Sequence, residues 1–216
     1  MPENYLTIKT SGSHELDIKK SQFICHLQRV TTKEDADAFI ETIRHQNTKA
    51  NHNCFAYMIG EHNEIQRESD DGEPSGTAGV PILEVLKKMN LHNLVAVVTR
   101  YFGGIKLGAG GLIRAYSNAT SRAIESVGLV KLVLQTSVTM TVSYSNFEKL
   151  GYFLEQQKIA IEDTAYTAQV KVEVAVDTPD LEALKNDVMN LLSGQTTFDV
   201  GTESYHEVDV PVYGES

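Results

Sequence analysis

The sequence is poor in cysteine and has no long apolar segment. Its two cysteines, Cys25 and Cys54, lie in separate strand-like segments and belong to no CxxC pair. They are expected to be reduced thiols buried as small apolar side chains, with a disulfide or a nucleophilic cysteine as the alternatives. No apolar run approaches the ~20 residues that span a bilayer. The first 20 residues are polar and lack the apolar core of a signal peptide. These absences predict a cytoplasmic protein that makes no membrane contact.

Several catalytic signatures are absent as well. No Gly-x-Ser-x-Gly, His-Glu-x-x-His or Cys-His-Asn pattern occurs, so the sequence gives no support to the hydrolases that carry them. Residues 100–111 read RYFGGIKLGAGG, with the glycine spacing of a phosphate loop. Ala109 and Gly110 stand where a Walker A loop requires Lys and Ser or Thr, and Ile113 breaks the dinucleotide pattern that starts at Gly108. Neither specific nucleotide motif is therefore present.

Negative charge is concentrated in one part of the chain. Up to Val133 there are 15 Lys and Arg against 15 Asp and Glu, and from Leu134 onward there are 4 against 14. The whole net charge of −10 therefore lies in the C-terminal part. We expect this part not to bind nucleic acid by itself, so that an anionic partner would contact the first part through a local patch.

The first part alternates strand and helix patterns. Acidic residues follow the possible N-caps Thr31 and Thr32, which predicts a helix. Pro81 opens a second helical pattern, and Gly128 ends a third. We predict strands within 16–30 and over 53–60, 61–69 and 93–102, helices over 31–47, 80–90 and 112–128, and a loop over 70–79.

The second part has a different order of predicted strands and helices. We predict strands over 137–144, 158–166, 168–176 and 196–210, and helices over 145–157 and 178–194. The first of these helices would be capped by Ser145 or Asn146, and the second would run from Pro179 to Gly194. This β-α-β-β-α-β order is typical of a ferredoxin-like fold. The sequence thus predicts an α+β protein with two domains, 1–133 and 134–216.

The glycine segment has two interpretations. It lies between a buried strand and a helix, and the free N–H groups at a helix N-terminus favour an anion. Arg100, Lys106 and Arg114 would add positive charge nearby. Alternatively, the glycines only allow strand and helix to pack closely.

The loop after residue 69 also has two interpretations. Asp70, Asp71 and Glu73 are close enough in sequence to hold Mg²⁺ or Ca²⁺, or to act as an acid/base pair. The same residues suit a solvated loop that caps a helix and pairs with an arginine, and this interpretation is preferred, with no metal site predicted. His52 would be a base or ligand, or simply a hydrogen-bonded structural histidine.

Three stretches together resemble the IMPACT family. They are HNCFAYMIG, RESDDGEPSGTAGVPILEVL and VVTRYFGGIKLGAGGLIRAYSNA, and the resemblance extends over residues 21–127. The acidic C-terminal part is similar to the second domain of bacterial members of the YigZ type. The resemblance implies a first domain with the fold of ribosomal protein S5 domain 2, and a ferredoxin-like second domain similar to the C-terminal domains of elongation factor G.

The resemblance also implies a function. Eukaryotic members of the family bind an activator of the amino-acid-starvation kinase and restrain phosphorylation of an initiation factor, as competitors and not as enzymes. They carry an N-terminal partner-binding domain that this sequence lacks, which predicts a bacterial protein with a different partner.

We therefore predict a cytoplasmic, non-enzymatic binding protein linked to translation or its stress regulation, without a cofactor and without catalytic residues. Its partner would be RNA, the ribosome or a translation-related protein; nothing in the sequence sets an oligomeric state. The predicted binding residues form one polar face: His52, Asn53, Arg67, Asp70, Asp71, Glu73, Thr77, Arg100, Tyr101, Gly103, Gly104, Lys106 and Gly108.

The alternative is an enzyme that acts on a small phosphorylated substrate at the glycine loop. His52 or Asp70 would then be the base, and Arg67, Arg100 and Lys106 would stabilise charge. The enzyme requires His52, Asp70 and Arg100 to converge in a concave pocket, whereas a binding protein requires a flatter exposed patch.

Overall fold

The computed structural model describes residues 4–60 and 62–211. The chain is a mixed α/β protein with two compact units. Among the described residues, the first unit comprises those up to Leu132 together with residues 208–211, and the second comprises Val133–Glu207. No helix of the described residues has both the length and the apolar character needed to cross a membrane.

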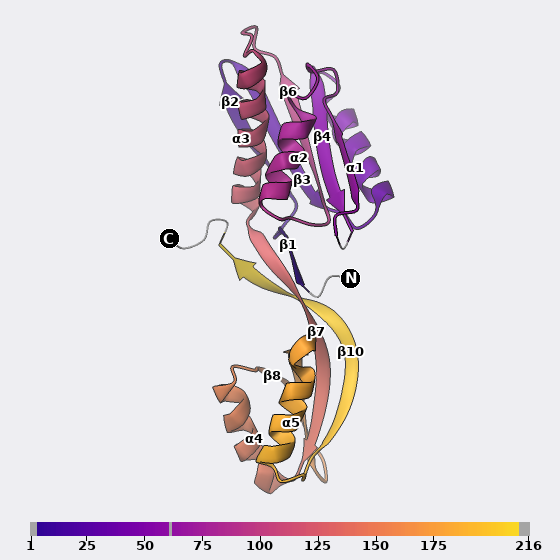
Figure 1. Cartoon of the computed structure of the whole chain (residues 1–216), viewed down its shortest axis with the longest axis vertical. Helices are drawn as coiled ribbons and strands as arrows, with labels where there is room; N and C mark the ends of the chain where they lie inside the picture. Colours follow the sequence, from indigo (N-terminus) through magenta and orange to yellow (C-terminus); the bar gives the residue numbers. More distant parts are fainter. Residues whose placement is uncertain (1–3, 61, 212–216) are drawn as a thin grey trace. The chain divides into compact units, whose positions relative to one another are not determined.

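The first unit is built on a five-stranded sheet with the order β2-β3-β6-β4-β5, in which neighbouring strands are antiparallel. Helices α2 and α3 cover one face of this sheet, and α1 covers the other (Figure 1). The elements are β2 (Gly12–Ile18), β3 (Ser21–Arg29), α1 (Lys33–Gln46), β4 (His52–Ile59), β5 (Ile65–Ser69), α2 (Gly79–Lys88), β6 (Leu94–Tyr101) and α3 (Ala109–Val127).

Strand β4 shows why this sheet needs helices on both faces. Its side chains alternate between the two faces, as in any strand. Cys54 and Met58 belong to the core under α2 and α3, whereas Phe55 and Tyr57 belong to the core under α1. Because both sets are apolar, the strand is buried on both sides. The same alternation decides which polar side chains at the start of β4 point toward the candidate functional site described below.

The helix ends agree with the predictions in part. The side chain of Thr32 caps α1, as one of the two predicted caps. Gly128, with φ of 75°, ends α3 as predicted. Helix α2 begins at Gly79, two residues before Pro81, and α3 begins at Ala109, three residues before the predicted start. The helix therefore includes part of the glycine segment.

The second sheet has the order β1-β7-β9-β8, with β10 also paired to β7. Its strands are β1 (Asn4–Ile8), β7 (Leu129–Val142), β8 (Ile161–Tyr166), β9 (Val170–Asp177) and β10 (Thr197–Val210), and β1 was not predicted. The second unit also contains α4 (Tyr144–Gln156), the 3-10 turn η1 (Thr178–Asp180) and α5 (Leu181–Leu191). Valines of β7 and β9 form an apolar core with leucines of both helices.

Two helix boundaries in the second unit differ from the predictions. The N-cap position of α4 is Ser143, because α4 already begins at Tyr144. The predicted caps Ser145 and Asn146 therefore lie inside the helix. Pro179 lies in η1, so α5 starts only at Leu181. Gly194 lies beyond the end of α5, with φ of 78°.

Candidate functional site

The strand directions bring four loops to one end of the first sheet. Strands β5 and β6 are both antiparallel to β4, so they run in the same direction. The loops that follow them, 70–78 and 102–108, therefore lie at the same end. Strands β3 and β4 begin there, preceded by residues 19–20 and 47–51. We call residues 19–21, 47–52, 70–78 and 102–108 the glycine-loop end.

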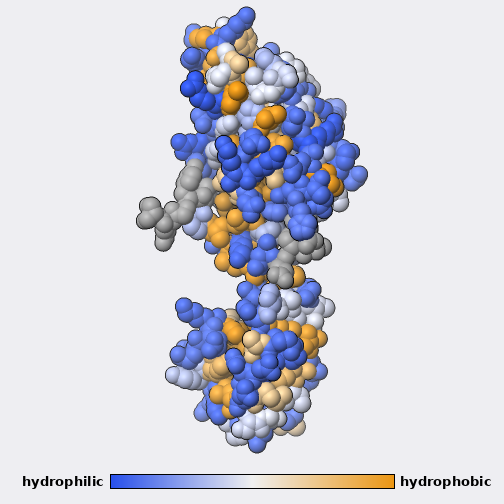
Figure 2. Space-filling view, viewed as in Figure 1, coloured by the Kyte–Doolittle hydropathy of each residue, from blue (hydrophilic) through white to orange (hydrophobic). Residues whose placement is uncertain are grey.

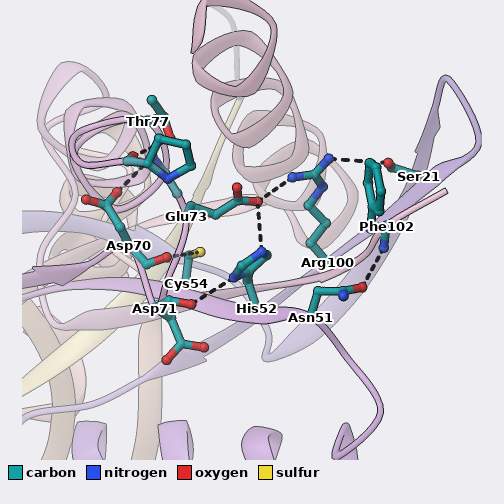
Figure 3. Close-up of polar contacts among 12 residues, drawn as sticks. Ser21, Asn51, His52, Cys54, Asp70, Asp71, Glu73, Thr77, Arg100 and Phe102 are labelled. Carbon is teal, nitrogen blue, oxygen red and sulfur yellow. Dashed lines mark hydrogen bonds and ion pairs between the residues drawn. The ribbon is translucent and has the colours of Figure 1, made fainter. Parts of the chain in front are cut away.

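A buried carboxylate lies at the centre of this end. Glu73 Oε1 accepts a hydrogen bond from Arg100 at 2.6 Å (Figure 3). It accepts a second from the Tyr116 hydroxyl at 2.8 Å. The side chains of Glu73 and Arg100 are only 3% and 6% exposed. A pair so deeply buried must compensate for the loss of water by its mutual contact and its further hydrogen bonds. The positive charge of Arg100 is therefore largely neutralised inside the protein.

Two aromatic rings enclose the guanidinium of Arg100. Its centre lies 5.3 Å from the ring of Phe23 and 5.4 Å from the ring of Phe102. Its NH2 contacts the Ser21 hydroxyl at 3.4 Å. Its Nε is buried and has no hydrogen-bond partner among the described residues. One donor of this arginine thus remains unused.

His52 is opposite Arg100 in the pairing of β4 with β6. Its Nδ1 lies 2.9 Å from the carbonyl oxygen of Asp71. A carbonyl can only accept, so Nδ1 carries the hydrogen, and Nε2 is the acceptor nitrogen of the neutral ring. Nε2 lies 3.9 Å from Glu73 Oε1, which is beyond hydrogen-bond distance. The histidine therefore has a structural bond on one side and a second nitrogen directed toward the buried pair.

The other two carboxylates hold the loop in place. Asp70 accepts backbone N–H bonds from Gly76, Ala78 and Gly79 at 2.8–2.9 Å, so it caps the start of α2. Partial burial raises the pKa of its carboxyl, but these three bonds outweigh that effect and hold the pKa below its ordinary value. Asp71 accepts from the Asn53 N–H and pairs with Arg44 at 3.2 Å.

The three carboxylates therefore bind three different groups of partners. The preferred interpretation of this loop, a helix cap that also pairs with arginine, matches these contacts. Thr77 contributes to the same loop by donating to the Pro74 carbonyl at 2.6 Å.

Three predicted residues lie on the other face of the sheet. Asn53 and Tyr101 occupy the alternate positions of β4 and β6, on the side of α1. The Asn53 side chain accepts from Thr99, and the Tyr101 hydroxyl donates to Asn47. Arg67 lies over the Phe55 ring and pairs with Asp37 at 3.4 Å. The predicted single polar face is thus divided between two faces, and Arg67 does not reach His52 and Arg100.

The glycines have distinct roles. A Cβ at Gly103 would overlap the carbonyl of Lys20, so this glycine permits close contact between two loops. Gly108 has φ of 72° and occupies the N-cap position of α3 without any side-chain cap. Gly104, with φ of 82°, has open space where a side chain would be. Both interpretations of the glycine segment are therefore represented, close packing at Gly103 and an uncapped helix start at Gly108.

A pocket of about 400 Å³ opens at this end. His52, Glu73 and Arg100 contribute its polar wall, and Lys106 lies at the same pocket. Phe102, Leu107 and Leu112 make much of the rest apolar, and the first residues of α3 complete it. Of the groups expected for an enzyme, His52 and Arg100 meet here, whereas the Asp70 carboxylate is occupied by the cap of α2.

Sequence reasoning missed two members of the buried network. Cys54 donates to the Asp70 carbonyl at 3.0 Å and contacts the Tyr116 hydroxyl at 3.4 Å. Burial raises the pKa of the Cys54 thiol to about 12, which makes it a poor nucleophile at neutral pH. Burial also raises the pKa of Tyr116. Tyr116 lies inside the predicted helix 112–128, and the one available signal was that a buried tyrosine hydroxyl requires a partner.

Comparisons with known proteins match both units. Residues 19–124 match the model of the Impact N-terminal domain, and residues 140–195 match a domain of unknown function, DUF1949. The IMPACT family member YvyE of Bacillus subtilis is 44% identical over 207 residues, which are 96% of this chain and 95% of that protein. YigZ of Escherichia coli is 36% identical over 162 residues, 74% of this chain and 79% of that protein.

A solved structure agrees with these matches. A crystal structure described as that of a hypothetical protein superposes with a TM-score of 0.59 at 30% sequence identity, over 92% of this chain and 97% of the other. The sequence resemblance is thus confirmed over nearly the whole chain, and the chain belongs to the IMPACT family.

Proposed function

We propose that this chain is a non-enzymatic RNA-binding protein that acts in translation or its regulation, and that the glycine-loop end contacts RNA. The link to translation comes from the family's eukaryotic members. The contact surface is inferred from the residues exposed at this end. The observation that carries the proposal is the pair of lysines, Lys19 and Lys20, in the turn between β2 and β3.

These two lysines adopt a backbone conformation that disfavours them. They form a two-residue turn, since Ile18 pairs with Ser21, and their φ angles are 47° and 67°. Such turns favour Asn-Gly, because both central residues need positive φ. Left-handed backbone costs an ordinary residue roughly 1–2 kcal/mol. Strained residues tend to occur where function requires them, which supports a role for these charges.

Other exposed cations lie at the same end of the sheet as this turn. Lys49 precedes β4, Lys106 lies in the glycine loop, and all four lysines are exposed. At the same end of the sheet, Phe102 is 45% exposed and Ile105 is 42% exposed. Figure 2 shows hydrophilic and hydrophobic residues side by side at this end, which is uppermost in the view. Lysines beside an exposed aromatic ring suit single-stranded RNA, which offers phosphates and unstacked bases together.

The buried ion pair supports binding over catalysis. Arg100 is paired with Glu73, and Cys54 is kept as a neutral thiol, so neither offers reactive charge. Asp70 is committed to the cap of α2. Of the predicted catalytic set, His52 and Lys106 remain at the pocket, and a single histidine base without an activated partner makes a weak case for an enzyme.

The test replaces the strained turn by the residues that the backbone prefers. We expect Lys19→Asn/Lys20→Gly to raise the free energy of unfolding by about 1 kcal/mol. The same variant should bind RNA less tightly, because two phosphate contacts are lost. Fluorescence anisotropy with a labelled single-stranded RNA of about 12 nucleotides measures this. The slope of log K against log salt should become shallower by about 1.4.

A charge-matched control is available in the same unit. Lys87→Gln/Lys88→Gln also removes two positive charges, but from the last turn of α2, at the opposite end of that helix from the glycine-loop end. It should leave RNA affinity and salt slope near the wild-type values. Equal losses in the two variants would mean that only net charge matters. Unchanged RNA binding in Lys19→Asn/Lys20→Gly would exclude the lysine turn as the contact, and binding only to a protein partner would refute the RNA-binding proposal.

We further propose the finer fold assignments and a division of labour between domains 1–133 and 134–216. The strand order β10-β7-β9-β8 and the chain order β-α-β-β-α-β support a ferredoxin-like second domain. The fold of ribosomal protein S5 domain 2 is the corresponding proposal for the first domain. The acidic second domain would repel free nucleic acid and so orient the first domain toward it. We place this activity in the cytoplasm.

A further inference from the structure

The pocket beneath the glycine loop has features that RNA-backbone contact alone does not require. It combines an apolar wall with an uncapped helix start. It also has two polar groups with unused hydrogen-bonding capacity, Arg100 Nε and His52 Nε2. Its volume of about 400 Å³ lies within the range of small-ligand pockets, about 300–1,000 Å³. A ligand that fits it should therefore be part apolar and part anionic.

The start of α3 supplies the site for the anionic part. The first intrahelical bond is donated by the Leu112 N–H, so the N–H groups of Gly110 and Gly111 point out of the helix end. No side chain caps this end and no acidic residue lies in its first turn. By contrast, Asp70 occupies the start of α2. The first turn of α3 is thus left open for an external anion, and Lys106 lies beside it.

Arg100 provides a second, independent indication of a ligand. Its side chain is more than nine-tenths buried and lies in the pocket wall. Its Nε has no partner among the described residues, which is costly for a buried donor. Figure 3 shows Arg100, His52 and Glu73 pointing toward one another at this wall. A residue of the pocket wall therefore keeps hydrogen-bonding capacity that the protein itself leaves unused.

Phe102 determines which anion fits best. Its ring is 45% exposed and lies over the guanidinium of Arg100. Base stacking on an exposed aromatic ring is a recurring feature of single-strand binding. A nucleotide carries a flat base and a phosphate in one molecule, whereas inorganic phosphate would leave the apolar wall uncovered.

We propose that this pocket holds one unpaired nucleotide of an RNA strand, with its base against Phe102 and its phosphate at the N-terminus of α3 beside Lys106. This inference rests on the proposed RNA-binding function and deepens it. It predicts that the protein prefers single-stranded RNA to a duplex, because a base-paired nucleotide cannot enter a pocket.

The test compares single-stranded and duplex RNA of the same sequence, for the wild type and Phe102→Leu. The substitution keeps an apolar side chain at an exposed position, so the fold should persist. We expect single-stranded affinity to fall about 5- to 150-fold, the equivalent of one lost stacking contact, and duplex affinity to stay unchanged. Tyr152→Leu, at a residue 67% exposed in the second unit, is the matched control and should change neither.

A direct measurement locates the ligand. Titration of the ¹⁵N-labelled protein with uridine or adenosine monophosphate should shift the Arg100 Nε–H and Gly110 amide resonances. Inorganic phosphate should shift the amide far more weakly at equal concentration. Equal effects of phosphate and nucleotide, with no loss in Phe102→Leu, would identify a plain anion site and overturn the nucleotide proposal.

The two variants distinguish failure of the pocket proposal from failure of the proposed RNA-binding function. If Lys19→Asn/Lys20→Gly weakens RNA binding but Phe102→Leu does not, the pocket proposal fails and the RNA-binding surface stands. If neither variant changes RNA binding, both fail. If only Phe102→Leu weakens single-stranded binding, the pocket stands and the lysine turn is not the contact.

Discussion

The two units differ most in what they bury. Nine of the ten buried polar or charged residues in the described part of the chain lie in the first unit, and Thr136 is the tenth. The core of the second unit is made almost entirely of valine and leucine. A buried ion pair is weak evidence for stability, because apolar residues of similar size often do as well. The first unit thus keeps costly groups of a kind that the second largely does without, and this supports the proposal of a site in the first unit.

Among the expected effects on the stability of the two units, the removal of Glu73 should have the largest. Glu73→Ala leaves the Arg100 charge buried and unpaired, so we expect the first unit to lose about 3–5 kcal/mol of stability. Hydrogen exchange followed by mass spectrometry measures this for each unit separately. Peptides of the first unit should exchange faster, and those of α4 and β9 should exchange at the wild-type rate.

A double variant sharpens the same comparison. Glu73→Leu/Arg100→Leu removes both charges and leaves no ion without its partner. Its first unit should be clearly more stable than that of Glu73→Ala, because the uncompensated charge is gone. A double variant as unstable as the single one would mean that packing around these side chains matters more than their charges.

Most of the secondary structure could be predicted from the sequence. Periodicity identified nearly every helix and strand, because the cores on both faces of β4 and under α4 are apolar and regular. Strand β1 was missed, and composition could not show that residues 208–211 group with the first unit, because contacts in the folded chain decide this.

The site was predicted less completely, for a geometric reason. Sequence neighbours such as His52 and Asn53 point to opposite faces of a strand, so a polar cluster in sequence was divided in space. The partners of Glu73 are distant in sequence, as Arg100 and Tyr116 are separated from it by two elements or more. Only the pairing of strands places them together.

A second difference between the units should appear at high pH. Both cysteines lie in the first unit, and burial raises the pKa of Cys25 and of Cys54 from 9.0 to about 12. Above pH 9 the unfolded chain releases these protons while the folded chain keeps them, so stability falls as pH rises. Between pH 9 and 10 we expect a loss of about 1 kcal/mol for each thiol.

Urea unfolding at several pH values measures this loss in the free energy of unfolding. Hydrogen exchange, corrected for the intrinsic exchange rate at each pH, measures it as well. Cys25→Ala/Cys54→Ala should flatten the decline between pH 9 and 10, whatever its stability at neutral pH. A decline of the same slope in the variant would show that the thiols are not responsible for it. The second unit contains no cysteine and should show no such dependence over this interval.

The smallest effect concerns how the helices of the two units begin. Asp70 accepts three backbone N–H bonds at the start of α2, whereas Ser143 makes no side-chain cap bond at the start of α4. Asp70→Ala should therefore cost about 1–2 kcal/mol, and Ser143→Ala less than about 0.5 kcal/mol. Because the pKa of Asp70 is lowered in the fold, its contribution is present at neutral pH and is lost as pH falls through that lowered pKa. Urea unfolding of the two variants at pH 7 and in acid would measure both differences. Equal costs at the two positions would mean that the polar loop of the first unit adds no more stability than an ordinary helix start, and the contrast between the units would then rest on the ion pair alone.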